Sequence, residues 1–294
     1  MSQPPHKSGF VSVIGLPNAG KSTLVNALSK EKLAIVTPKA QTTRHRIRVI
    51  LSGEGYQVVL SDTPGLVKAQ YKLHDAMMKV VGESLSDADL ILFLTEPGKG
   101  GKEELIHEVL SKVNSPIIAV INKCDKLGKE KVAAYHKVLE EMKMFSEIIH
   151  ISALKKQGTD DLLQKMIDLM PEGPPWFPED QVSDRNVRFF VSEMIREQAL
   201  RLYEQEIPYA VEVEIEGYEE KEHIDRIRAV IHVERTSQRA IILGHQGSAI
   251  KNLGTRARMD IEKFVGKKVY LELFVKVSKD WRNRGLKLRE FGYE

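Results

Sequence analysis

The sequence predicts two domains, an α/β domain with a mostly parallel, doubly wound sheet and a smaller α+β domain after it. The chain has 294 residues, whereas one domain typically holds roughly 150. The first part alternates β-branched apolar runs with amphipathic segments, and the second part has the order helix, strand, strand, helix, helix, strand. A proline-rich stretch, PEGPPWFPED, lies between them. We therefore expect domains over 1–172 and 186–294, joined by a linker over 173–185.

The elements of the first domain follow one another in a βα rhythm. The apolar stretch 10–15 predicts a strand that leads through a glycine loop into a helix beginning at Lys21. The stretches 46–52 and 56–62 flank the turn GEG and predict a hairpin, which adds one antiparallel strand to the sheet. Three further strands and a closing helix are expected at 90–96, 116–123, 147–153 and 160–170. Ligands of such sheets bind at the carboxyl ends of the strands.

Composition limits the class of protein. Hydrophobic residues make up 42% and charged residues 29%, an ordinary balance for a soluble protein, and no apolar run approaches the roughly 18 residues of a membrane-spanning helix. The first residues lack the basic, apolar and small-residue sections of a secretory signal, so we expect a cytoplasmic protein. The single cysteine, Cys124, follows an apolar run and is expected to be a packed thiol.

The stretch GLPNAGKS after the first strand matches the P-loop pattern, in the strand–loop–helix context that the pattern requires. Backbone N–H groups of such a loop hold phosphate oxygens. Lys21 would place a cation between the β- and γ-phosphates, and the Ser22 hydroxyl would bind Mg²⁺. An ordinary glycine turn would not need these residue types at these offsets. The expected nucleotide contacts are Gly15, Leu16, Pro17, Asn18, Ala19, Gly20, Lys21, Ser22 and Thr23.

The stretch DTPGL follows the strand 56–62. Asp62 is placed to hold the magnesium through a water, and the Gly65 N–H can sense a γ-phosphate. Thr63, Pro64 and Leu66 complete this expected contact. Many nucleotide hydrolases have a glutamine at the position of Leu66 to orient the attacking water. A hydrocarbon cannot do so, and we expect Leu66→Ala to leave the chemistry intact.

Between these two motifs lies KAQTTRHRIR, in which a threonine should reach the magnesium only in the triphosphate state. We favour Thr43 over Thr42 because it directly precedes Arg44. The basic residues of this stretch allow two interpretations, a solvated strand edge or a contact with RNA. They are Arg44, His45, Arg46 and Arg48.

The stretch NKCD, Asn122 to Asp125, follows the strand 116–123 and selects the base. The Asp125 carboxylate can accept hydrogen bonds from the N1–H and the exocyclic amine of guanine, whereas adenine presents an acceptor at N1. The motif therefore predicts GTP rather than ATP, with Lys123 and Cys124 as further contacts. Ser152 and Ala153 would close over the guanine with backbone contacts.

The second domain is expected to contain RNA-binding features. Its helices and strands are predicted at 187–204, 209–218, 224–235, 238–244, 248–266 and 268–277, followed by a basic tail. From Glu193 to Glu234 the chain has 5 basic and 12 acidic residues, whereas from Arg235 to Arg289 it has 14 basic and 4 acidic. The turn GHQG between two helices looks like the GxxG loop of a KH domain, although a glycine helix cap would look similar. The expected RNA contacts are Arg239, Gly244, His245, Gln246, Gly247, Lys251, Arg256 and Arg258.

Over essentially its whole length the chain resembles the Era family of bacterial GTPases. The matching stretches are GLPNAGKSTLVNAL, KAQTTRHRI, DTPGL, NKCD, ISA, FPEDQVSDRNVRFFVSEMIRE, the ILGHQGSAIKNLGTRARMDIEK region and VKVSKDWR. The resemblance implies an α/β P-loop GTPase domain followed by an α+β type II KH domain. It also implies a GTP- and Mg²⁺-dependent factor in assembly of the small (30S) ribosomal subunit, which binds 16S rRNA near its 3′ end. A monomer with peripheral association with the inner membrane is part of the same expectation. His245 and Gln246 depart from the family, which often has a lysine there.

Lys21, Asn18, Thr43 and Gly65 are the residues we expect to take part in hydrolysis. Relatives stimulated by potassium suggest that Asn18 helps to bind K⁺ beside the phosphates, where other systems insert an arginine. Two other classes of function remain: an RNA-binding protein in which GTP is structural, and a small-molecule kinase. NKCD and the lack of a recognisable lid disfavour the kinase.

Overall fold

The computed structural model describes residues 5–98 and 103–293. Within them the chain forms two compact units. The first unit combines the residues up to Lys68 with Met77–Asp184, and the second combines Ala69–Ala76 with the residues from Arg185 onward. Each unit has its own sheet.

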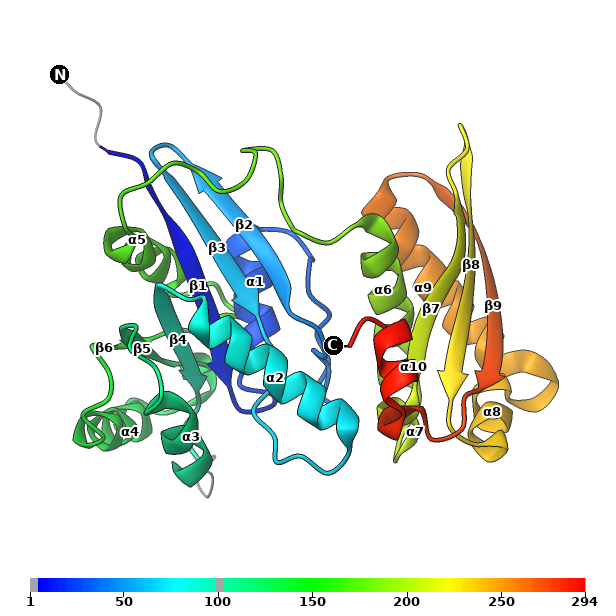
Figure 1. Ribbon diagram of the computed structural model, residues 1–294, viewed down its shortest axis with the longest axis horizontal. Coiled ribbons are helices and arrows are strands. Elements are labelled where there is room, and N and C mark those ends of the chain that lie inside the picture. Colours follow the sequence, from blue (N-terminus) through cyan, green and yellow to red (C-terminus); the bar gives the residue numbers. More distant parts are fainter. Residues whose placement is uncertain (1–4, 99–102, 294) are drawn as a thin grey trace. The chain divides into compact units, whose positions relative to one another are not determined.

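The first unit is built on a six-stranded sheet with the order β2-β3-β1-β4-β5-β6 (Figure 1). The strands are β1 (Lys7–Gly15), β2 (Ile47–Gly53), β3 (Tyr56–Asp62), β4 (Leu90–Thr95), β5 (Ile117–Ile121) and β6 (Glu147–His150). Only the β2–β3 pair is antiparallel in the described sheet; the other neighbours run parallel. The mostly parallel sheet and its hairpin are therefore confirmed.

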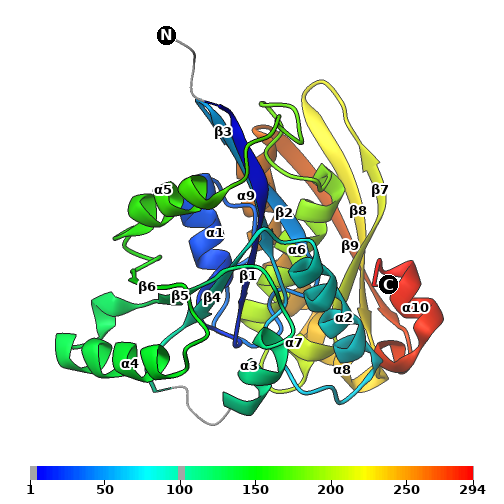
Figure 2. The same cartoon turned by 60° about the vertical axis from the view of Figure 1, so that its left-hand side comes forward.

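Helices cover both faces of this sheet (Figures 1 and 2). They are α1 (Lys21–Ser29), α2 (Lys72–Ser86), α3 (Glu103–Leu110), α4 (Lys129–Glu141) and α5 (Thr159–Leu169). Helices α1 and α5 pack on one face, whereas α2, α3 and α4 pack on the other, where Ile14, Ile91 and Phe93 form the centre of a buried cluster. Both faces of the central strands are buried, which explains why these strands are nearly continuous apolar runs.

The segment after α5 is held along the edge of the first unit. The Gln57 carboxamide accepts hydrogen bonds from the N–H groups of Trp176 and Phe177, at 2.8 and 2.9 Å. Farther along, the Ile50 N–H donates to Val182 O at 3.0 Å, beside the edge strand β2. Covering an edge strand satisfies its backbone groups and removes a site for unwanted strand pairing. The stretch expected as a linker thus has defined contacts with the first unit.

The second unit has the sheet order β7-β8-β9, in which β8 is antiparallel to β7 and parallel to β9 (Figure 1). Its larger elements are α6 (Val187–Leu202), β7 (Glu212–Glu219), β8 (Ile224–Val233), α8 (Thr236–Leu243), α9 (Ser248–Val265) and β9 (Lys268–Val277). Helix α9 packs on both α6 and β9. The expected order helix, strand, strand, helix, helix, strand is confirmed.

Two parts of the second unit differ from the expectation. The strand expected from residue 209 begins only at Glu212, because α7 (Ile207–Ala210) precedes it with proline in its first turn, where a proline fits a helix. The expected basic tail contains α10 (Gly285–Glu290). Trp281 and Tyr293 anchor this tail, since the Trp281 Nε1–H donates to Ala210 O at 2.9 Å and the Tyr293 hydroxyl donates to Glu212 at 2.6 Å.

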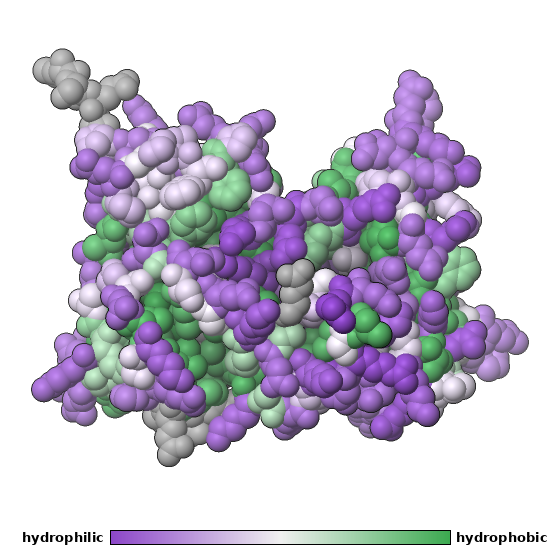
Figure 3. All heavy atoms as spheres, viewed as in Figure 1, coloured by the Kyte–Doolittle hydropathy of each residue, from purple (hydrophilic) through white to green (hydrophobic). Residues whose placement is uncertain are grey.

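Hydrophilic residues cover most of the visible surface of each unit (Figure 3). Among the described residues, no helix combines the length and the apolar character needed to cross a membrane.

Candidate functional site

The loop between β1 and α1 adopts a tight backbone conformation that requires glycine at two positions, Gly15 and Gly20. Gly20 has φ 102°, and a Cβ atom added there would lie 2.3 Å from the Asn122 side chain. A Cβ atom on Gly15 would lie 2.2 Å from Leu94 O. The buried Lys21 ammonium donates to Gly15 O and Leu16 O at 3.2 and 3.3 Å, inside the curve of the loop. The sequence therefore folds into a compact phosphate cradle with one cation at its centre.

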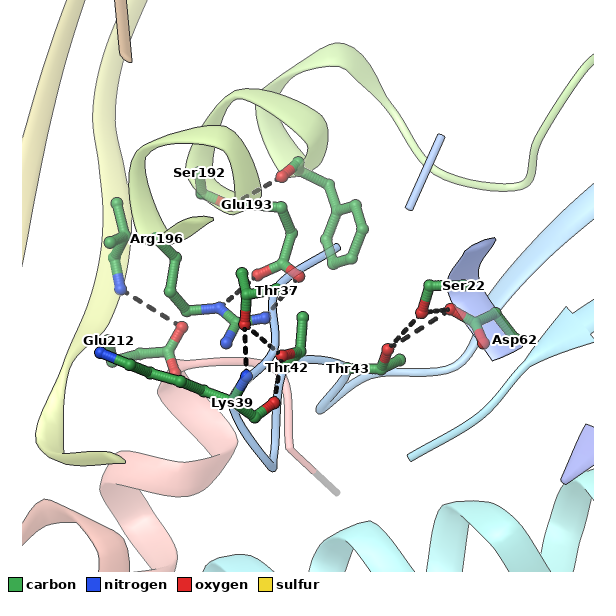
Figure 4. Close-up of polar contacts among 12 residues, drawn as sticks. Ser22, Thr37, Lys39, Thr42, Thr43, Asp62, Ser192, Glu193, Arg196 and Glu212 are labelled. Atoms are coloured by element: carbon green, nitrogen blue, oxygen red, sulfur yellow. Dashed lines mark hydrogen bonds and ion pairs between the residues drawn. The ribbon is translucent and has the colours of Figure 1, made fainter. Parts of the chain in front are cut away.

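Three oxygen-bearing side chains from separate parts of the chain meet beside this loop (Figure 4). The Ser22 hydroxyl lies 2.8 Å from Asp62 Oδ2 and 2.9 Å from the Thr43 hydroxyl, and Thr43 lies 3.4 Å from the same carboxylate oxygen. Asp62 is fully buried and Thr43 nearly so. Two hydroxyls and one carboxylate are hard oxygen donors of the kind that Mg²⁺ prefers, so the residues present fit that ion.

Thr42 points to different partners. Its hydroxyl donates to Lys39 O at 2.6 Å and contacts the Thr37 hydroxyl at 2.7 Å. The geometry thus favours Thr43 over Thr42 as the magnesium ligand. Thr37 was not predicted as a site residue, and its position five residues before Thr42 gives no signal of this contact. A concavity beside the loop is lined by Pro17, Asn18, Gly20, Lys21, Ser22, Thr23, Thr37, Thr43 and Gly65, among others.

The DTPGL stretch lies against the phosphate loop through its backbone. The Leu66 N–H donates to Gly15 O at 3.1 Å, and the Thr63 hydroxyl donates to Val13 O at 2.7 Å. A Cβ atom on Gly65 would lie 3.0 Å from the backbone of Pro17, so the glycine permits this close approach. The Leu66 side chain is fully buried in the apolar cluster under α2 and α3. This agrees with the expectation that Leu66 positions no water.

The expected guanine loop connects three distant segments. The Asn122 carboxamide donates to Ala19 O at 2.8 Å and accepts from the Ala153 N–H at 3.0 Å. Ser152 donates to Asp125 Oδ1 at 2.6 Å, which orients the carboxylate expected to read the base. Strands β5 and β6 are parallel neighbours, so the loops after them reach the same edge of the sheet.

Lys123 and Cys124 have separate roles in this loop. The Lys123 ammonium donates to Asn18 O at 2.7 Å and forms an ion pair with Glu96 at 2.7 Å. Glu96 was not predicted as a site residue, although its position directly after β4 indicates the edge of the sheet where ligands bind. Cys124 is half-buried, its Sγ donates to Ile121 O, and burial raises the pKa of its thiol. A thiol with a raised pKa carries little thiolate, as expected for a packed cysteine.

The basic run before β2 is mostly engaged within the first unit. Arg44 is fully buried. Arg46 forms an ion pair with Asp87 at 2.7 Å, although burial lowers the pKa of its guanidinium, and Arg48 forms one with Asp184 at 3.6 Å. These ion pairs disfavour an RNA contact. None of the four basic residues is exposed, so the run is not the solvated strand edge that was the other expectation either.

The GHQG turn connects α8 to α9 in the second unit. Gly244 has φ 70°, and a Cβ atom there would lie 2.6 Å from the Ala249 Cβ. Gly247 has φ 78° and open space around the position of its missing Cβ, so another chain can approach its backbone closely. His245 and Gln246 are exposed. The turn therefore has a backbone conformation that requires glycine at its ends, and its two middle residues are accessible.

A groove of about 290 Å³ lies between α9 and β9 beside this turn. Lys251 and Arg258 line it together with Gly254, Leu271 and Leu273. The other two predicted cations do not line this groove: Arg239 lies on α8, and Arg256 donates to Asn252 at 3.2 Å on α9. All four cations are exposed. The structure thus brings two of the four to the groove.

The sheet, the phosphate loop and the magnesium-type oxygen cluster define the first unit as a P-loop nucleotide-binding domain with the guanine loop of GTPases. Comparisons with known proteins give the same class, because residues 10–123 match the family described as 50S ribosome-binding GTPase, and residues 206–282 match the KH domain. The chain is 45% identical to GTPase Era of Clostridium kluyveri, over 98% of this chain and 99% of that protein. It belongs to the Era family of GTPases.

Three further comparisons extend along the chain. GTPase Era of Alkaliphilus metalliredigens is 42% identical over 98% of this chain and 99% of that protein. A crystal structure of Era in complex with MgGDPNP and nucleotides 1506–1542 of 16S ribosomal RNA is 36% identical, with a TM-score of 0.94 over 98% of this chain and 99% of that one. A crystal structure of a single-residue variant of Aquifex aeolicus Era bound to GDP and AlF₄⁻ gives a TM-score of 0.93 over the same shares.

Proposed function

We propose that this chain binds and hydrolyses GTP and, in doing so, controls its binding to 16S rRNA near the 3′ end during assembly of the small ribosomal subunit. The meeting of Ser22, Thr43 and Asp62 beside Lys21 carries the nucleotide part of this proposal. The RNA part is supported by the groove beside the GHQG turn and by the relative crystallised with MgGDPNP and 16S rRNA.

Magnesium would be held by Ser22 and Thr43 directly and by Asp62 through a water, and it would supply positive charge to the β- and γ-phosphates. The two hydroxyls lie within hydrogen-bonding distance of Asp62, so the three oxygens are already close together. Thr43 lies in a loop, whereas Ser22 is on α1 and Asp62 on β3. Loss of the γ-phosphate would release Thr43 more readily than the other two residues.

Guanine would be selected by Asp125, which Ser152 orients, and enclosed by the loop around Ala153. Asn122 ties this loop to the phosphate loop at Ala19. The loops expected to contact the base and the phosphates are therefore joined by a hydrogen bond.

Hydrolysis would depend on fixed charge and backbone rather than on a water-orienting side chain. Lys21 and the loop amides stabilise charge on the transferred phosphoryl group, which is most of what phosphoryl transfer requires. The Gly65 N–H would donate a hydrogen bond to the γ-phosphate. We further propose that Asn18 helps to bind K⁺. Its Nδ2 donates to Pro38 O at 2.7 Å, and its side-chain oxygen is the atom that would coordinate the ion.

The RNA backbone would approach Gly247, while Lys251 and Arg258 meet phosphates along the groove. Arg239, Gly244, His245, Gln246 and Arg256 would provide further contacts around it. The family resemblance also predicts a cytoplasmic monomer with peripheral association with the inner membrane, which light scattering and co-sedimentation with anionic vesicles would test.

The test is a multiple-turnover assay of phosphate release from GTP, in K⁺ or Na⁺, with and without small ribosomal subunits or an RNA of the 16S 3′ end. We expect slow basal release that K⁺ and the small subunit increase. An RNA-binding protein with structural GTP would bind the same RNA but release no phosphate repeatedly. Equal turnover in K⁺ and Na⁺ would remove the potassium proposal while leaving the GTPase in place.

A further inference from the structure

A pocket of about 640 Å³ that is partly open to solvent lies between helices α2 and α3, separate from the nucleotide site. Met78, Val81 and Leu85 line it from α2, and Leu105 and Val109 line it from α3. In Figure 3, apolar atoms gather on this side of α2. The volume of this pocket lies within the range of small-molecule sites.

Leu66 forms the floor of this pocket. Its side chain is fully buried, and its backbone N–H is bonded to Gly15 O in the phosphate loop. The residue before it, Gly65, lies against Pro17 on the nucleotide side. Leu66 therefore contacts both the pocket and the phosphate cradle, and the preceding Gly65 lies on the cradle side alone. A molecule that fills the pocket would pack on Val81 and Leu85, which belong to the same buried cluster as Leu66, and would act on Leu66 through them.

We propose that this pocket binds a small, mostly apolar, uncharged molecule with one hydrogen-bonding end, and that its occupancy changes nucleotide hydrolysis through Leu66. The second part rests on the proposed GTPase function, whereas the binding itself does not.

The size and charge of the pocket determine this class of ligand. Small-molecule sites occupy about 300–1,000 Å³, whereas a stable protein interface needs about 800 Å² on each partner, far more than this pocket exposes. Lys112 and Glu108 at the rim pair with each other at 3.2 Å, so the rim carries no net charge from them. The exposed Asn114 carboxamide, also at the rim, offers one donor group and one acceptor to a polar end.

Substitution of Gly82 by a larger residue can block the pocket. It lies on α2, lines the pocket, and a Cβ atom added there would meet no atom within 4 Å. Gly82→Phe would project a ring into the pocket, and Gly82→Ala is the matched control, because alanine also replaces a helical glycine but adds only one carbon. Gly82→Leu is a second, smaller blocking variant, and binding of a fluorescent GDP analogue verifies that each variant is folded.

The experiment is a titration of the full chain with the neutral dye Nile red, whose emission rises in apolar surroundings. We expect Gly82→Ala to bind the dye as the original chain does, and Gly82→Phe and Gly82→Leu to weaken binding at least about ten-fold. In the original chain and Gly82→Ala alone, saturating dye should change the rate of phosphate release about five-fold or more, within the usual range of coupling between two sites. The charged dye 1-anilinonaphthalene-8-sulfonate should bind more weakly than Nile red.

Equal Nile red binding by the alanine and blocking variants would overturn the proposal, because the dye would then lie elsewhere. Dye binding that the blocking variants abolish, but that leaves phosphate release unchanged, would overturn the coupling. If the blocking variants lost stimulation by small subunits while no variant bound the dye, the pocket would be a protein-docking site instead. A chain that released no phosphate would refute the proposed GTPase function, while the dye titration would still decide the binding.

Discussion

The nucleotide site and the RNA groove differ in how their functional residues are held. In the first unit, Lys21, Asp62 and Asn122 are buried. Lys21 is bonded to its own loop at Gly15 and Leu16, whereas Asp62 and Asn122 are bonded to Ser22 and Ala19, which are distant in the sequence. In the second unit, Lys251 and Arg258 are exposed on one helix beside a fixed glycine turn. Chemistry on a phosphate needs a preorganised, water-poor site, whereas binding of RNA phosphates adds up over separate cations. Single substitutions should therefore have large effects in the first site and small, additive effects in the second.

The largest effect is expected from Lys21→Ala. Removing the one cation in the phosphate loop should lower the rate of single-turnover GTP hydrolysis about 10²–10³-fold, the usual size when one preorganised donor to the transferred group is lost. Lys79→Ala, on the exposed side of α2, is the matched control and should keep the original rate. A Lys21→Ala protein that hydrolysed GTP within three-fold of the original would contradict the idea of a cooperative buried site.

The next effect is expected from Asp125→Asn. An asparagine can still accept hydrogen bonds from Ser152 and from the purine N1–H through its side-chain oxygen. Its side-chain NH₂, however, would face the exocyclic amine of guanine, which is also a donor. Losing a charge-assisted hydrogen bond costs about 1.5–3 kcal/mol, so GTP affinity should fall about 10- to 150-fold, while xanthosine triphosphate should bind better than before. Titration with fluorescent nucleotides measures both. Asp161→Asn is the control, and unchanged base preference in Asp125→Asn would remove Asp125 from the base site.

A smaller effect should separate the two threonines. Thr43→Ala is expected to weaken binding of a non-hydrolysable GTP analogue about ten-fold, since one magnesium ligand is lost, while GDP affinity changes little. Thr42→Ala should lower the affinity for both nucleotides equally and only slightly, because the Thr42 hydroxyl is hydrogen-bonded to Lys39 O and Thr37. The reverse pattern would assign the magnesium to Thr42.

In the RNA groove, Lys251→Ala and Arg258→Ala should each weaken binding of single-stranded 16S 3′ RNA by a few-fold. Each change should also reduce the slope of log affinity against log salt by about 0.7, the value for one phosphate contact on a single strand. Fluorescence anisotropy at several salt concentrations measures this. Lys263→Ala, on the same helix but outside the groove, is the comparison variant. If one cation alone abolished binding, the contrast between additive and cooperative sites would be wrong.

The smallest effect on the chemistry is expected from Leu66→Ala. Its buried side chain should cost about 2–5 kcal/mol of unfolding free energy on truncation, yet phosphate release should stay within about five-fold. Chemical denaturation and single-turnover hydrolysis at a temperature below the transition measure the two quantities. A loss comparable to that of Lys21→Ala would mean that Leu66 takes part in the reaction.

The sequence predicted those parts of the protein that depend on local patterns. The glycine loop, the hairpin and the αββααβ order follow from spacing, turn residues and alternation, and Thr43 could be favoured from its neighbour alone. Contacts between segments that are distant in the sequence could not be predicted from local patterns. The pair of Glu96 with Lys123 and the burial of Leu66 under α2 and α3 depend on which strands become neighbours in the sheet. The helix α7 was missed because Pro208 was not taken as a helix start.

Asn122 has a consequence for the order in which the protein is made. Its carboxamide connects Ala19, near the beginning of the chain, to Ala153, about 130 residues later. At a synthesis rate of about 5–20 residues per second, the phosphate loop leaves the ribosome many seconds before its guanine-side partner exists. A nascent chain can therefore present the phosphate loop early, but the complete nucleotide site is assembled only after the loop following β6 has been released. The bonds of this one side chain thus make the complete nucleotide site depend on nearly the whole first unit.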